Sequence, residues 1–130
     1  PPDALTEAVL ARSLELTIAF IGYDSPPLPA VEVLSTILRL GGDKHTLVLR
    51  KSLSLAMLIV RNKDWGTDMA YSTMLFRRSQ ADLHDCIVRI AERLRQSSFT
   101  ADADRAAGLL GGHFWTLATS DRRATCARTL

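Results

Sequence analysis

Apolar side chains recur every three or four residues along most of this chain, which is the period of an α-helix and not of a strand. Asp3 is placed to cap a first helix, which Gly22 and residues 23–27 end. Two stripes on this helix predict that it is covered on more than one side, as inside a bundle. The first stripe consists of Leu5, Val9, Leu16 and Phe20, and the second of Leu10, Leu14 and Ile18.

Three more helices with the same period follow, and they begin at Pro29, at Asp43 and after residues 64–68. Proline suits the first turn of a helix, and aspartate suits the position just before one. Two glycines at 41–42 end the second helix, and the turn at 97–98 ends the fourth. We therefore expect four helices before residue 97.

A fifth helix is predicted at residues 99–117. Thr100, Asp102 and Asp104 place oxygen acceptors where a helix start has unpaired N–H groups. Glycine inside a helix costs about 1 kcal/mol relative to alanine, so three glycines need a reason, and close approach of another helix supplies one. The small residues are Ala106, Ala107, Gly108, Gly111 and Gly112, and the bulky ones are Leu109, Leu110, Phe114, Trp115 and Leu117.

This pattern predicts an all-α fold, a helical bundle of about five main helices that forms one domain over residues 1–130. Residues 120–130 are expected to be a flexible tail or a short extra helix. The apolar run at residues 53–60 also fits a buried strand. A helix is favoured there because helices flank it and the sequence offers no partner strand.

Composition narrows the classes of function. A net charge of +2 gives no field strong enough to hold nucleic acid by itself. Cys86 and Cys126 are too few for a disulfide framework, which favours a reducing, cytoplasmic location. The longest apolar run is too short to span a bilayer, and the charged residues near the start do not fit a signal peptide. We expect a soluble chain with no membrane partner.

Catalytic and metal-binding patterns are sparse. His84, Asp85 and Cys86 are consecutive, but neighbours on a helix point about 100° apart, so they cannot jointly activate a nucleophile. His45 and His113 have no partner at metal-ligand spacing. The sequence therefore predicts no enzyme activity, no catalytic residue, no metal and no cofactor.

Three segments carry a likeness to a known family. Residues 3–10 read Asp-Ala-Leu and then Ala-Val-Leu, residues 63–71 open a long helix, and residues 101–112 combine paired alanines with trailing glycines. In this order they resemble the C-terminal ligand-binding and dimerisation domain of TetR/AcrR-family transcriptional regulators. The prolines that the family often has before Trp65 and after Asp102 are absent.

The resemblance implies transcription regulation by a homodimer whose last helices form a four-helix interface. The earlier helices would enclose a small hydrophobic or amphipathic effector, and the effector would favour one arrangement of two DNA-reading headpieces. No helix-turn-helix precedes Asp3. We therefore expect DNA binding only through a headpiece that lies outside these residues.

The expected site residues lie in the later helices, where aromatic, methionine and polar side chains gather. Such stripes are also typical of plain core, and small residues also serve packing within one chain. A different class of function stays open, namely a helical adaptor that binds another protein through an exposed groove. The expected ligand-binding residues are Met57, Trp65, Tyr71, Met74, Leu75, His84, Ile87 and Phe114, and the expected dimer residues are Ala107, Leu110, Gly111, Gly112, Trp115 and Thr119.

Overall fold

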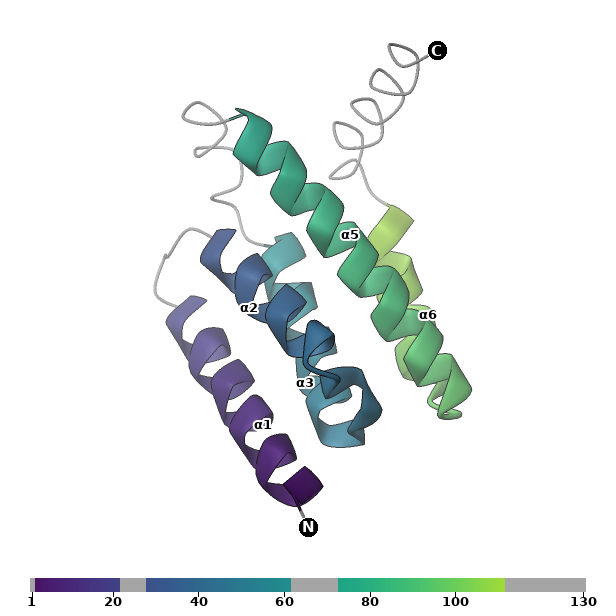
Figure 1. Cartoon of the computed structure of the whole chain (residues 1–130). Coiled ribbons are helices and arrows are strands. Elements are labelled where there is room, and N and C mark those ends of the chain that lie inside the picture. The colour runs from purple at the N-terminus through teal and green to yellow at the C-terminus, as the bar shows by residue number, and fades with distance from the viewer. Residues whose placement is uncertain (1, 22–27, 62–72, 112–130) are drawn as a thin grey trace, which may run out of the picture.

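The computed structural model describes residues 2–21, 28–61 and 73–111, and within them the chain forms five α-helices and no strand. The all-α prediction is confirmed for these residues. Two short 3-10 helices, η1 and η2, complete the described elements. The bounds are α1 Pro2–Ile21, α2 Leu28–Arg39, η1 Gly42–Lys44, α3 Thr46–Arg61, α5 Thr73–Gln96, α6 Thr100–Gly108 and η2 Leu109–Gly111 (Figure 1).

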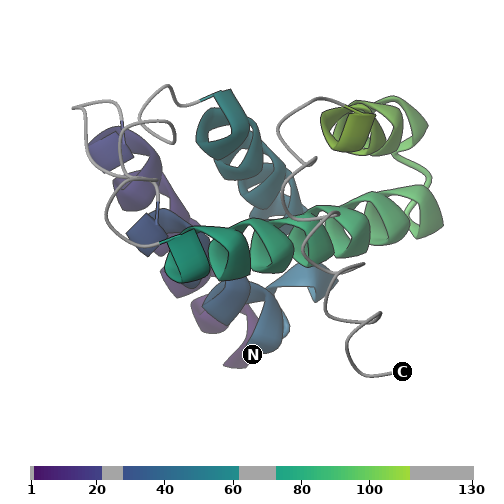
Figure 2. The same ribbon diagram turned by 90° about the horizontal axis from the view of Figure 1, so that it is seen from above.

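The helices form a bundle in which α3 contacts α1, α2, α5 and α6. In Figure 1, α1 lies to the left of α2 and α3, and α5 and α6 lie to their right. The view from above in Figure 2 shows α6 beside the C-terminal half of α5. The described helices are short or polar enough that none of them would cross a membrane.

The core lies on the apolar faces of α3 and α5. On α5, Leu83, Ile87, Ile90 and Leu94 recur at intervals of three and four residues, and all four are fully buried. On α3 the buried positions wrap around more of the helix, because four helices pack against it. They are Val48, Leu49, Ser52, Leu53, Leu55, Ala56 and Ile59.

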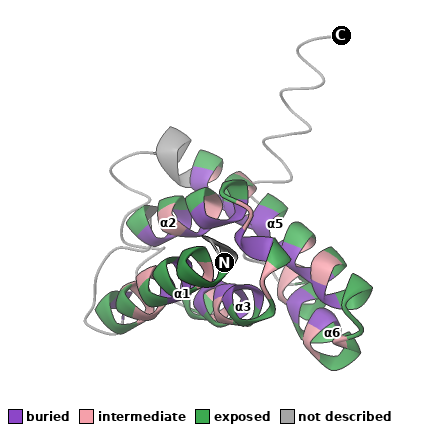
Figure 3. Cartoon of the chain, turned by 60° about the horizontal axis from the view of Figure 1, so that its bottom comes forward, coloured by how far each residue is buried: buried purple, intermediate pink, exposed green. Residues whose placement is uncertain are grey.

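The expectation that α1 is covered on more than one side is wrong for this chain by itself. Leu10 and Leu14 are buried, but the stripe on the opposite face stays exposed (Figure 3). The reason is that α2 and α3 both pack against the same side of α1. The exposed side chains are Leu5, Val9, Leu16 and Phe20, with exposed fractions of 70%, 55%, 55% and 67%. We call these four residues the outer stripe.

The glycine pair after α2 ends the helix, as the sequence predicts. Gly41 has a φ of 83°, a left-handed conformation that glycine adopts without steric cost. Gly42 is needed for a different reason. A Cβ atom there would lie 2.7 Å from Ile37 Cγ2 and 2.8 Å from the Ile37 carbonyl oxygen. The turn therefore brings its backbone directly onto α2.

The turn between α5 and α6 uses the same backbone conformation without glycine. Ser98 has a φ of 68°. Its N–H donates to the Arg95 carbonyl oxygen at 3.1 Å, and the Phe99 N–H donates to the Leu94 carbonyl oxygen at 2.9 Å. These two bonds form a Schellman motif, which reverses the chain and lays α6 against α5.

Replacing Ser98 by glycine is expected to stabilise the protein by ~1 kcal/mol, because the left-handed conformation costs a residue with a Cβ about that much. Urea unfolding followed by circular dichroism measures the change. Ser97→Gly is the matched control, because Ser97 is equally exposed but has no positive φ. The explanation fails if Ser98→Gly is no more stable than Ser97→Gly.

Candidate functional site

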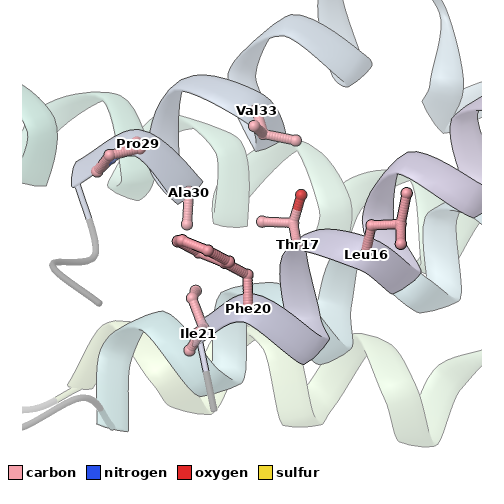
Figure 4. Close-up of a pocket in the computed structure, with 7 residues that line it drawn as sticks. All are labelled: Leu16, Thr17, Phe20, Ile21, Pro29, Ala30 and Val33. Carbon is pink, nitrogen blue, oxygen red and sulfur yellow. The ribbon is translucent and has the colours of Figure 1, made fainter. Parts of the chain in front are cut away.

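An apolar cavity of about 460 Å³ lies between α1 and α2 (Figure 4). Figure 4 shows Ala30 and Phe20 facing each other across this space. The lining positions of each helix are spaced so that they lie on one side of it, because 16 and 20, 17 and 21, and 29 and 33 are each four residues apart. The lining residues are Leu16, Thr17, Phe20, Ile21, Pro29, Ala30 and Val33.

A second hollow of about 430 Å³ continues along the same pair of helices and shares Thr17 and Val33 with the first. Together they form one surface feature, which we call the α1–α2 groove. Apart from Thr17, which both hollows share, the polar residues of the groove are Ser13, Glu32 and Thr36 in the second hollow. The other residues of the second hollow are Val9, Leu10, Ile37 and Leu40.

Thr17 is the one polar side chain of the first hollow. Its hydroxyl donates to the Ser13 carbonyl oxygen at 2.8 Å, inside α1. The proton of this hydroxyl is therefore used by the helix, and the wall offers mainly methyl, methylene and aromatic carbon. Such a surface favours an apolar molecule over a charged one.

The predicted ligand-binding residues lie elsewhere in the described chain. Ile87 is fully buried in the core, and Met57 and His84 are half-buried. None of these three lines the α1–α2 groove. Trp65, Tyr71 and Phe114, and the side chains of Met74 and Leu75, lie outside the described residues.

Sequence reasoning missed the groove because it assigned both stripes of α1 to the interior of the bundle. The available signal was the second apolar stripe itself, since Leu16 and Phe20 belong to it and line the groove. A helix with apolar residues on two faces indicates either a second covering helix or a binding surface. Periodicity alone does not distinguish these two cases.

The predicted dimer residues lie at the end of α6, which is shorter than expected. The α-helix ends at Gly108 and continues as η2 to Gly111, instead of running unbroken toward residue 117. Ala107 and Gly111 are exposed, and Leu110 is half-buried. The remaining expected residues, Gly112, Trp115 and Thr119, lie outside the described residues.

The glycines of this segment have no close neighbour in the described part of the chain. A Cβ atom built on Gly108 or Gly111 would meet no described atom within 4 Å. Packing within the described chain therefore gives no reason for their small size. The sequence therefore still favours the explanation that a helix from outside the described residues packs closely against these glycines.

Asp43 does not cap α3, contrary to expectation. Its buried carboxylate faces α5, where Arg89 donates from Nε and Nη2 at 2.9 Å and 3.2 Å. Arg93 Nε lies 3.3 Å from the same carboxylate. The physical reason is that η1 places Asp43 one turn before α3, and the His45 carbonyl oxygen accepts the first backbone hydrogen bond, from Leu49.

The acidic residues at the start of α6 also bind arginines instead of capping the helix. Phe99 is the N-cap residue of α6, and no side chain caps it. Asp102 lies 3.4 Å from Arg50 Nε, and Asp104 lies 3.4 Å from Arg95 Nη2. The Arg50 guanidinium also stands 5.3 Å from the centre of the Phe99 ring, within cation–π range. These contacts attach α6 to α3 and α5.

Cys86 has the opposite of the environment that activates a nucleophile. Burial raises the pKa of its thiol to about 11, and the nearby carboxylates of Asp82 and Asp85 add to the shift. The thiol is therefore protonated at neutral pH, whereas catalytic cysteines need a lowered pKa. Among the described residues, no three His, Cys, Asp or Glu side chains are grouped so that they would hold a metal ion.

Comparisons with protein-family models, with curated proteins and with solved structures find no match to this chain.

Asp43→Asn is expected to lower the free energy of unfolding by about 2 kcal/mol, because a hydrogen bond to a charged group contributes about 1.5–3 kcal/mol and Asp43 is buried. Urea unfolding at pH 7 measures this. Asp104→Asn is the matched control, since its pair with Arg95 is exposed and is worth at most about 0.5 kcal/mol. Equal losses in the two variants would contradict the assignment.

Proposed function

We propose that this chain is the regulatory domain of a TetR-like transcriptional regulator, which binds a small, mostly apolar effector and dimerises to control a DNA-reading headpiece. The α1–α2 groove carries the proposal. Its first hollow of about 460 Å³ falls within the roughly 300–1,000 Å³ that small-molecule sites occupy, and its lining is mainly apolar. The family is suggested by the order of the three similar segments in the sequence.

The groove also indicates the chemical class of the effector. Its first hollow would hold an apolar body, and Ser13, Glu32 and Thr36 in the second hollow would meet a polar end. Glu32 is exposed and acidic, so a neutral or cationic polar end fits better than an anionic one. We therefore expect a hydrophobic or amphipathic molecule without a carboxylate at that end.

The dimer part of the proposal rests on α6. Ala107, Gly108 and Gly111 are exposed and small, and the two glycines have open space beside them among the described residues. Such a surface lets a helix of a second copy approach closely. Effector binding would act on the regulator only if one arrangement of the two copies binds it better than the other.

A helical adaptor is the second candidate function, and the outer stripe of α1 favours it. Four large apolar side chains, each more than half exposed, are typical of a surface that meets another macromolecule. An adaptor would take an amphipathic helix along the α1–α2 groove and would need no small molecule. Binding of a small apolar probe in the groove distinguishes the two candidates.

N-phenyl-1-naphthylamine, an uncharged apolar fluorophore, is expected to bind this chain, and Val33→Glu is expected to weaken binding at least tenfold by placing a charge in the groove. Fluorescence titration measures the affinity. At a concentration 100-fold above its dissociation constant, the probe is also expected to add ~2.7 kcal/mol of stability.

Val60→Glu is the matched control for this titration, because Val60 is also half-buried against the core but belongs to α3. Its affinity is expected to equal that of the unchanged chain. The effector site is refuted if the probe binds Val33→Glu and Val60→Glu with equal affinity. It is also refuted if the probe does not bind the unchanged chain.

Ala107→Glu is expected to halve the mass of the protein in light scattering at tens of micromolar, because two carboxylates at a close helix–helix contact repel each other and lose hydration. Ala101→Glu, also exposed on α6 but six residues away on another face, is expected to leave the mass unchanged. The α6 interface is refuted if both variants keep the mass of the unchanged chain.

A further inference from the structure

The outer stripe of α1 is symmetric along the helix. Leu5 and Phe20 lie equally far from the midpoint between residues 12 and 13, and so do Val9 and Leu16. An α-helix rises about 1.5 Å per residue. If a second α1 lay antiparallel with the same midpoint, Leu5 would be level with Phe20 of the other copy, and Val9 with Leu16. A stripe of this kind is self-complementary, as an interface on a twofold axis must be.

We propose that the outer stripe binds a second copy of this chain, with the two α1 helices antiparallel and centred between residues 12 and 13. The outer side of α1 is open along its length in Figure 3, so no described element blocks this approach. The inference concerns α1 alone and does not depend on the α6 interface proposed above.

The exposed area of the outer stripe would supply most of a small specific contact. With exposed fractions of 55–70%, the four side chains present about 450 Å² of apolar surface, on the basis that a large apolar side chain exposes ~150–200 Å². Two copies would bury at most about 900 Å² from these side chains, which exceeds most chance contacts at less than about 800 Å² and leaves the rest of a stable interface of about 1,200 Å² to the surrounding residues. Leu40, which directly follows α2 and is also exposed beside the groove, would extend the contact.

Arg12, the charged side chain near the centre of the stripe, is paired with a carboxylate within each copy. Arg12 Nη1 lies 3.3 Å from Glu15 Oε2, and Lys51 Nζ lies 3.0 Å from Glu15 Oε1. The hydrogen bonds from Lys51 and Arg12 hold the pKa of Glu15 below its usual value, so this carboxylate is ionised at neutral pH. Glu15 serves both Lys51 and Arg12, so it reduces but does not cancel the repulsion between two Arg12 side chains near the twofold axis.

The pairing would also affect the groove. Leu16 and Phe20 belong to the outer stripe and also line the first hollow. A second copy against the stripe would cover the side of the hollow that these residues form. Pairing of α1 and occupation of the groove would then be coupled, with each changing the free energy of the other.

Cysteine cross-linking tests the register. In a Cys126→Ser background, the single variant Arg12→Cys and the double variant Val9→Cys/Leu16→Cys are expected to form covalent dimers under mild oxidation. Val9→Cys alone is expected not to, because its two copies would lie about 10 Å apart along the axis, beyond disulfide reach. Cys86 is buried and its pKa is about 11, so it stays out of the reaction.

Leu47→Cys measures the background rate of cross-linking by chance collisions, because Leu47 lies on α3 and is about as exposed as Val9 and Leu16. The proposal is overturned if Arg12→Cys cross-links no faster than Leu47→Cys. It is equally overturned if Val9→Cys alone cross-links as fast as the double variant, because the register would then be different.

Light scattering separates this interface from the one on α6. Leu16→Glu is expected to halve the mass while keeping the helical circular-dichroism signal, because Leu16 is exposed, and Leu47→Glu is expected to change neither the mass nor that signal. The double variant Leu16→Glu/Ala107→Glu is expected to be a monomer. If Leu16→Glu leaves the mass unchanged, a second copy does not bind the stripe and the proposal is overturned. This conclusion does not depend on the effect of Ala107→Glu.

Discussion

The fold depends on the burial of α3. This helix contacts all four other described α-helices, and Val48, Leu55 and Ile59 are fully shielded from water. Each side chain of this size gains about 1.5–3 kcal/mol when it is fully buried. The same constraint explains the surface of α1. Because α2 and α3 pack against one side of α1, that side is buried and the other apolar stripe is left facing outward. The groove and the proposed self-association surface both result from this arrangement.

Arginine contacts between helices complement the apolar core. Asp43 joins the turn before α3 to α5, and Arg50 of α3 lies between Asp102 and the Phe99 ring at the start of α6. Neither contact is between neighbours in sequence. Because a buried carboxylate is costly without a partner, the pairing of Asp43 favours the position of α5 in which both its arginines reach the carboxylate.

Much of the fold could be predicted from the sequence, and most of the site could not. The period of apolar residues marks helices such as α5, and the glycines at 41–42 mark the end of α2. Periodicity shows which residues share a face but not what covers that face. For this reason the sequence pattern alone places the outer stripe in the interior of the bundle. The partner of Asp43 lies 46 residues away, beyond any local rule. The groove depends on how α1 and α2 pack, which the sequence pattern does not determine.

The central claim is that an apolar molecule binds between α1 and α2. Methyl-resolved NMR of the chain, titrated with N-phenyl-1-naphthylamine, tests it most directly. If the probe binds in the groove, methyl signals of Leu16, Ile21 and Val33 shift in proportion to occupancy, while those of Leu58 on α3 do not move. Shifts confined to Met57 and Ile87 would place the site in the later helices instead and would contradict the account.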